Sequence, residues 1–132
     1  MEHTATTALR SLLNGVLYFS ESENPFIVSD WGKILVSDLP QQIAEHFDRR
    51  PEDLKRIEPD TFFEKIVHRA DPSDRIVIEH AQKLAAFYQK IKFSLSNIQV
   101  TRVEGKVQIP ILITGYTEDG TCLVAETLSI ET

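Results

Sequence analysis

Apolar side chains recur every three or four residues in several stretches of the chain, a spacing that places them along one face of a helix. The longest stretch predicts a helix from the segment Asp71-Pro72-Ser73-Asp74 to about Asn97, because aspartate accepts hydrogen bonds from the first free amides and proline has no amide to leave unbonded. Its predicted buried stripe consists of Ile78, Ala81, Leu84, Tyr88, Ile91 and Leu95.

Shorter helices are predicted in the first half of the chain. The first is expected to stop at Asn14-Gly15, because glycine accepts the left-handed conformation that ends many helices. The expected positions are residues 4–14, residues 39–47 beginning at Pro40, and a segment capped by Asp60 that carries Phe62, Phe63, Ile66 and Val67.

Alternating apolar and polar residues predict strands, most of them in the second half of the chain. Pro110 lies within one of these strands and has no amide to donate, so an edge or a bulge is expected there. Glu118-Asp119-Gly120 is a predicted hairpin turn before the last strand. The predicted strands are residues 16–19, 26–31, 98–103, 107–113 and 122–130.

The connecting segments are polar or charged. Residues 20–25 are expected to form a loop, residues 32–38 to continue a hairpin, and residues 49–59 to form a loop or a brief turn. Because the helices and the antiparallel strands segregate, the pattern predicts one α+β domain over residues 1–132.

Charge narrows the function classes. The chain of 132 residues carries a formal net charge of −6, which disfavours direct nucleic-acid binding, a function that relies on clustered Lys and Arg. An acidic balance suits either a basic protein partner or simple solubility. Cys122 is the single cysteine, so no internal disulfide forms. With no visible secretory signal and no apolar run of the about 20 residues that a membrane span needs, a cytoplasmic protein is expected.

No recognisable catalytic apparatus is present. None of the 4 histidines lies at metal-ligand spacing with another, and the chain has no phosphate-binding loop, dinucleotide fingerprint or nucleophile elbow. A structural role is expected for Cys122, a turn for Glu118-Asp119, and a place in the core for Trp31. The sequence therefore predicts neither an enzyme nor a cofactor.

Glu21 and Glu23 lie in a loop between two predicted strands, flanked by serines and aromatic residues. Binding residues concentrate in loops on a rigid scaffold, and paired carboxylates also serve acid–base chemistry or hold a hard cation. From the residues alone, a solvated loop, a contact site and a hydrolase site all remain open. The lack of a supporting histidine or metal cluster counts against the hydrolase.

The same loop begins a set of segments that resembles the nuclease A inhibitor family, small proteins that inhibit sugar-non-specific DNA/RNA endonucleases. Its most specific segment is the Ser-Glu-Ser-Glu-Asn-Pro-Phe run within residues 17–26. The resemblance is weakest over residues 32–59 and implies a three-layer α/β/α sandwich with a largely antiparallel central sheet. The other matching segments are Asp60-Thr61-Phe62-Phe63, Phe87-Tyr88-Gln89-Lys90, Leu95-Ser96-Asn97, Gln99-Val100, Ile113-Thr114-Gly115 and Glu131-Thr132.

The resemblance also implies a partner, a nuclease with a catalytic metal in a basic cleft. The chain is expected to be a monomer when free, to occlude that cleft in the complex, and to have no contact with a membrane. Glu21, with Glu23 in the same run, is expected to meet a basic residue of that cleft, and Thr132 to reach the partner's metal. Asp74 matches an interface aspartate, but Arg75 stands where the family has tryptophan, a typical interface hot spot. Carboxylates substitute for phosphates opposite Arg or Lys, and oxygen ligands suit Mg²⁺.

Arg75 and the weakly matching residues 32–59 leave a second hypothesis open, an interaction module on the same scaffold with a non-nuclease target. Without the resemblance, Glu21 is interpreted as a solvated loop residue, Asp74 as part of the first helical turn, and Thr132 as a frayed end.

Overall fold

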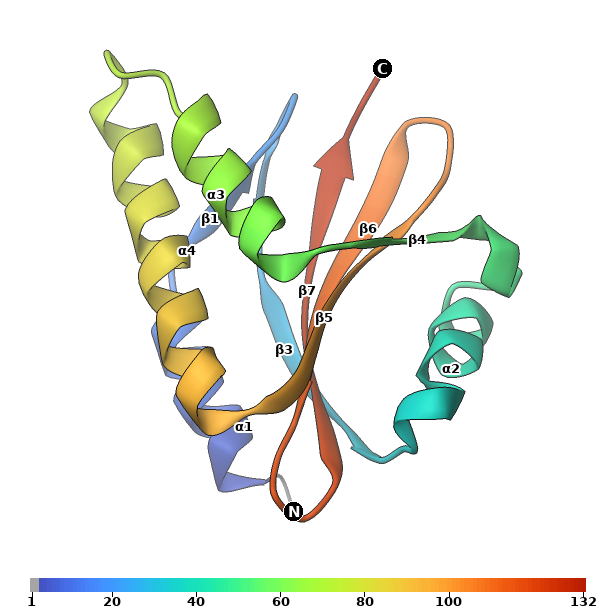
Figure 1. Cartoon of the computed structure of the whole chain (residues 1–132). Helices are drawn as coiled ribbons and strands as arrows, with labels where there is room; N and C mark the ends of the chain where they lie inside the picture. Colours follow the sequence, from blue (N-terminus) through green and yellow to red (C-terminus); the bar gives the residue numbers. More distant parts are fainter. Residues whose placement is uncertain (1–2) are drawn as a thin grey trace.

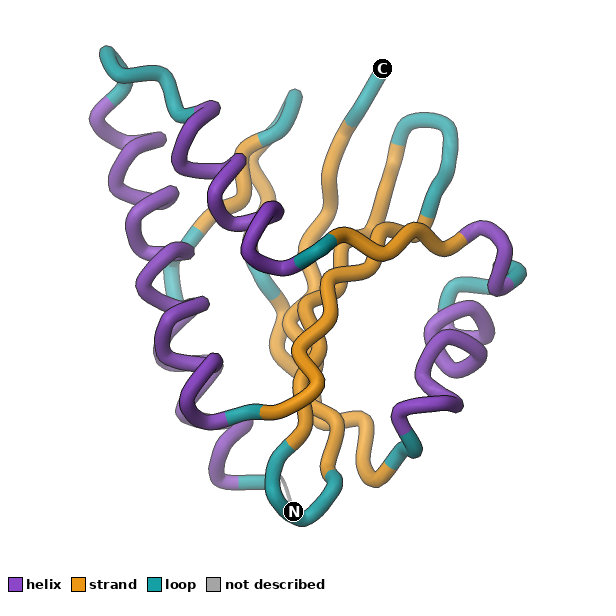
Figure 2. The backbone as a smooth tube through the Cα atoms, viewed as in Figure 1, coloured by secondary structure: helices purple, strands orange, loops and turns teal. Residues whose placement is uncertain are grey.

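The computed structural model describes residues 3–132 and contains one central sheet. The strands of this part of the chain are β1 (Leu17–Phe19), β2 (Glu23–Pro25), β3 (Ile27–Lys33), β4 (Leu54–Ile57), β5 (Ser96–Val103), β6 (Gln108–Tyr116) and β7 (Thr121–Ile130). Five of them form the antiparallel sheet in the order β3-β7-β6-β5-β4, which is strongly twisted in Figure 2, and β1 and β2 form a separate hairpin.

Helices cover both faces of the sheet (Figure 1). In the described residues they are α1 (Thr4–Leu13), α2 (Leu39–His46), α3 (Pro59–Arg69) and α4 (Arg75–Ser94), with short 3-10 helices at Val36–Asp38 and Pro51–Asp53. Helices α1, α3 and α4 lie on one face and α2 lies on the other. This arrangement confirms the predicted α+β fold, with layers in the expected α/β/α order. No helix within residues 3–132 is long and apolar enough to cross a membrane.

The core divides into two apolar clusters, one on each face of the sheet, because side chains alternate along each strand. Ile111 and Ile113 of β6 pack on the side of α1, α3 and α4, whereas Leu112 packs with Leu39 of α2. Trp31 is half-buried against the second cluster, as expected for a core residue. Burial of these side chains supplies most of the force that holds the layers together.

The predicted helices are confirmed, but the predicted cap of α3 is wrong. Glu58, rather than Asp60, caps this helix, because its carboxylate accepts the amide hydrogen of Thr61 at 2.9 Å. Asp60 lies inside the first turn, where its carboxylate accepts a hydrogen bond from the Tyr88 hydroxyl of α4. The Asp60 side chain therefore joins α3 to α4 and does not cap α3.

The start of the long helix is also later than predicted. Helix α4 begins at Arg75, and Asp74 caps it by accepting the amide hydrogen of Val77 at 3.2 Å. Asp71 closes a tight turn before the helix by accepting from the amide and the hydroxyl of Ser73. Asp71 and Asp74 both accept bonds of the capping type, but only Asp74 stands directly before the first residue of α4.

Three segments differ from the predicted loops and hairpin because their partners are distant in the sequence. Strand β2 pairs with β1, so residues 20–25 are a tight hairpin rather than a loop. Strand β4 pairs with β5 at the sheet edge, where a loop or turn is predicted. After β3, Val36–Asp38 forms a 3-10 helix that leads into α2 and no hairpin continues. Pairing satisfies the polar backbone groups in each strand, which local composition does not reveal.

Pro110, where an edge or a bulge is predicted, lies in β6, which is a central strand of the sheet. Its register partner on β7 is Leu128, whereas the pairing of β6 with β5 ends at the Arg102–Ile111 pair. The missing amide therefore falls where β6 is paired on only one side, which is the local condition that proline requires.

The β6–β7 hairpin turns at Glu118-Asp119-Gly120, as predicted. Gly120 has a φ of 86°, which glycine adopts without strain. Asp119 accepts the amide hydrogen of Thr121 at 3.2 Å, so this carboxylate has a structural role in the turn.

Candidate functional site

The turn between β1 and β2 is joined to the end of β7, at the end of the molecule where the chain terminates (Figure 1). Ser20 Oγ accepts a hydrogen bond from the amide of Ile130 at 2.9 Å, and the amide of Glu21 donates to the carbonyl of Ile130 at 3.3 Å. These bonds fix Glu21 beside the C-terminus.

Glu21 and Thr132 meet although they lie far apart in the sequence. The amide of Thr132 donates to one carboxylate oxygen of Glu21 at 2.5 Å, and the Thr132 hydroxyl donates to the other at 2.6 Å. The hydroxyl, followed by the amide, lowers the pKa of Glu21 below its usual value, because both bonds stabilise the charged form. Both residues are exposed. They form one ionised, solvent-facing unit, termed here the terminal pair.

The residue before Thr132 is held by a side-chain clamp. Both terminal nitrogens of Arg102 donate to the carboxylate of Glu131, each at 2.8 Å, and Ser129 Oγ donates to it at 2.7 Å. The bonds from Arg102 make the largest contribution to lowering the pKa of Glu131 to about 2. A two-pronged arginine–carboxylate contact fixes orientation as well as position. Thr132 therefore extends from an anchored residue.

We expect Arg102→Ala to lower the free energy of unfolding by about 1–2 kcal/mol, because charge-assisted bonds to partly exposed carboxylates are lost. Those carboxylates belong to Glu131 and Glu104. Urea denaturation measures the loss. Arg56→Ala is the matched control, since the Arg56 side chain has no hydrogen bond or ion pair with any residue of 3–132. Equal losses in the two variants would contradict the clamp.

The same clamp predicts a pH dependence on the acid side. The pKa of Glu131 is about 2 in the folded chain against an ordinary 4.5, so its stabilisation is complete above about pH 4.5 and disappears as the pH falls toward 2. The difference in unfolding free energy between the wild type and Glu131→Gln should shrink over that range. Urea denaturation at a series of pH values checks this, and a difference that stays constant down to pH 2 would refute it.

The other predicted contact residues lie at the same end of the molecule. Glu23 is exposed in β2 opposite Phe19, and Asp74 and Arg75 stand at the start of α4. In Figure 1 the α3–α4 loop, the β1–β2 turn and the C-terminus share this end. No hydrogen bond or ion pair within residues 3–132 joins the side chain of Asp74 or Arg75 to the terminal pair.

Sequence reasoning missed the clamp, although one signal was present. Arg102 lies two residues after the buried Val100 in β5 and so points to the same face of the sheet, the one that α1, α3 and α4 cover. A charged side chain at such a position requires a partner. The sequence does not reveal that the partner is Glu131, because the two are 29 residues apart.

Other chemistry-bearing residues have structural roles. Burial raises the pKa of Cys122 to about 11, so the thiol stays protonated at neutral pH. Nδ1 of His80 accepts a hydrogen bond from the amide of Leu17 at 3.0 Å. Across residues 3–132, no group of three or more His, Cys, Asp or Glu side chains is placed to hold a metal ion.

Comparison with known proteins gives one family. The family model described as nuclease A inhibitor-like protein matches residues 3–132. No curated protein matches the chain. The family match spans the terminal pair and the clamp as well as the helices and strands that position them.

Proposed function

Because the chain belongs to the nuclease A inhibitor-like family, we propose that it binds a metal-dependent, sugar-non-specific nuclease and occludes its active site. The terminal pair carries this proposal, since it presents an ionised carboxylate and the chain terminus at one exposed point. A nuclease cleft that holds phosphates and a metal ion offers a complementary group for each.

Glu21 acts as the phosphate substitute. A carboxylate has about four lone-pair positions, so Glu21 can accept both bonds from Thr132 and still bind an Arg or Lys of the partner. Such charge-assisted bonds are strong and geometrically specific. Attraction between an acidic chain and a basic cleft also speeds encounter and weakens as salt increases.

Thr132 supplies an oxygen ligand to the partner's metal. Its hydroxyl oxygen is a hard donor, the type that Mg²⁺ takes, and Mg²⁺ sites commonly keep exchangeable water positions. The metal belongs to the nuclease, so the inhibitor needs no cofactor of its own.

The clamp between Arg102 and Glu131 preorganises the terminus. Chain ends are usually poorly ordered, and ordering them on binding reduces affinity. Here the residue before Thr132 is already held by bonds of 2.8 Å and 2.7 Å. Less conformational entropy is lost when Thr132 enters the partner's cleft.

Glu23, Asp74 and Arg75 extend the contact around the terminal pair in this proposal. Arg75 is exposed and brings positive charge toward a basic cleft. This residue favours the second candidate function, an interaction module on the same scaffold with a non-nuclease target. In the first candidate function, the chain is a cytoplasmic monomer when free and is not itself an enzyme.

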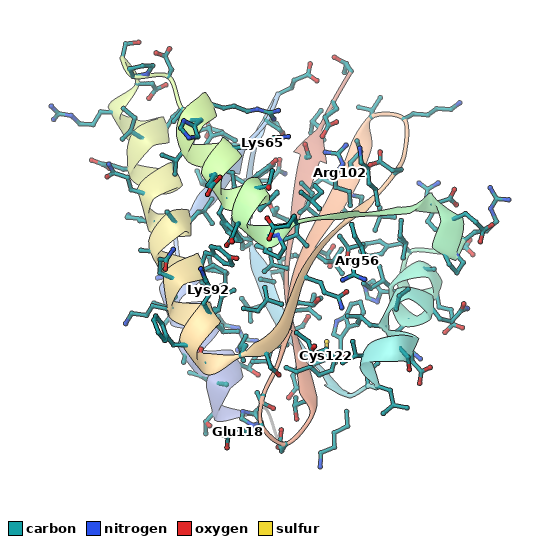
Figure 3. All side chains as sticks on the ribbon, viewed as in Figure 1. Arg56, Lys65, Lys92, Arg102, Glu118 and Cys122 are labelled. Carbon is teal, nitrogen blue, oxygen red and sulfur yellow. The ribbon has the colours of Figure 1, made fainter. Side chains whose placement is uncertain are left out.

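Titration of a metal-dependent, sugar-non-specific nuclease with the purified, untagged chain tests the proposal. Plasmid cleavage should fall linearly and stop near one chain per nuclease. Glu118→Ala is the control, because Glu118 lies at the opposite end of the molecule from the C-terminus (Figures 1 and 3). Undiminished cleavage by several such nucleases at a large excess of chain would overturn the proposal and favour the second candidate.

A further inference from the structure

A cleft of about 940 Å³ lies between α3, the β1–β2 hairpin and the end of the sheet, a volume typical of ligand sites. Buried and half-buried apolar residues form its walls, and exposed or half-buried basic residues lie around them. The apolar residues include Leu17, Phe62, Ile66, Val77, Ala81 and Leu84. We propose that this cleft binds a small organic anion with an apolar body, a function beyond nuclease inhibition.

Five basic residues line the cleft; Arg56 lies on the side of α2, and the other four come from three elements. Lys65 and Arg69 lie one turn apart on α3, and Lys55 and Arg102 are register partners on β4 and β5. Figure 3 shows Lys65 on the side of α3 that faces the sheet, with Arg102 across from it and Arg56 on the side of α2. Like charges at these spacings repel each other. An anion in the cleft would relieve that repulsion.

Three of the four carboxylates that line the cleft are committed elsewhere. Glu58 caps α3, Asp71 binds Ser73, and Glu21 binds Thr132. None of these three carboxylates forms an ion pair with a described residue. The fourth, Glu131, neutralises Arg102, so Lys55, Lys65 and Arg69 have no ion pair within residues 3–132.

Only Arg102 among the four cations has an ion-pair partner, through Glu131 and Glu104. Within residues 3–132, the side chains of Lys55, Lys65 and Arg69 form no hydrogen bond or salt bridge. Arg69 does lie close enough to Glu131 to help lower the pKa of that carboxyl. In a chain of net charge −6, three such cations at one cleft are a specific local complement to an anion.

The apolar walls select the body of the ligand. An inorganic ion would leave the surface of Phe62, Ile66 and Leu84 uncovered, whereas an aromatic or aliphatic group would bury it. The Tyr18 ring stacks on Phe62 at 6.1 Å between centroids and offers a further flat surface in the cleft. The anionic head then lies among the three cations and the body lies against these side chains.

The test titrates the full chain with 8-anilinonaphthalene-1-sulfonate, an aromatic sulfonate that fluoresces in apolar surroundings. The wild type should show one saturable site that weakens with salt. Reversing two charges with Lys65→Glu and Arg69→Glu should weaken binding by about tenfold or more. The control pair, Lys83→Glu with Lys106→Glu, changes the net charge equally at exposed lysines outside the cleft, and affinity should stay within about twofold.

Amide chemical shifts of the labelled full chain locate the dye, and the changes should cluster on the cleft residues. Circular dichroism confirms that each variant is folded, and if the charge reversal does not fold, Lys65→Gln with Arg69→Gln should still weaken binding. Absence of binding, equal loss in the two charge-reversed pairs, or shift changes centred elsewhere would overturn the proposal. Because the free chain is used, these results do not depend on the nuclease.

Discussion

Glu21→Ala is expected to weaken inhibition of the target nuclease by about thirtyfold or more, the effect of truncating one member of a buried charge pair in a complex. The substitution removes the carboxylate that holds Thr132 in the free chain. In the proposed complex it also removes the charge that faces the partner's basic residue. The inhibition constant from titrated plasmid cleavage gives the result.

Because Glu21 is exposed in the free chain, the urea midpoint of this variant should match that of the wild type. Glu23→Ala should lose less inhibition, since the carboxylate of Glu23 makes no bond to the terminus within the described residues. If Glu21→Ala inhibits as strongly as the wild type, Glu21 is not the phosphate substitute and the contact lies elsewhere.

Adding Gly-Ser-Gly-Ser after Thr132 is expected to reduce inhibition by about a hundredfold or more, since a metal ligand and its neighbouring contacts are displaced together. The added residues place bulk between the terminal pair and the partner's metal. The anchor at Glu131 remains, so the fold is preserved.

The same four residues placed before Met1 are the control for added length. Helix α1, the first element of the described chain, lies at the opposite end of the molecule from the C-terminus in Figure 1, so inhibition should be unchanged. Full inhibition by the chain extended after Thr132 would show that a free terminus is unnecessary, and the metal-reaching role would be wrong.

Local sequence patterns were sufficient to predict the elements that are formed by residues close together in the sequence. The apolar stripe of α4 and the β6–β7 hairpin follow directly from helical spacing, alternation and a glycine at the turn. Strands β2 and β4 depend on pairing with other strands, and their polar or charged composition conceals it. The sequence did not identify the N-capping residues of α3 and α4, because Glu58, Asp60, Asp71 and Asp74 are all suitable acceptors. Only backbone geometry selects among them.

The candidate site shows the same division. Composition alone favours a solvated loop for Glu21 and a frayed end for Thr132, and only the family resemblance assigns them a role. The folded chain brings these two residues into hydrogen-bond contact. The clamp depends on a cross-strand arrangement of Arg102 and Glu131, which no local spacing encodes.

The central claim is that the terminal pair enters the partner's metal site. Replacing the nuclease metal with paramagnetic Mn²⁺ in a complex with isotope-labelled chain tests it directly, because the ion broadens resonances of nearby nuclei. The amides of Thr132, Glu131 and Glu21 should broaden most, and those of the Glu118 turn at the far end should stay sharp (Figure 3). Sharp signals from the terminal pair, with broadening centred on another surface or nowhere, would contradict the account.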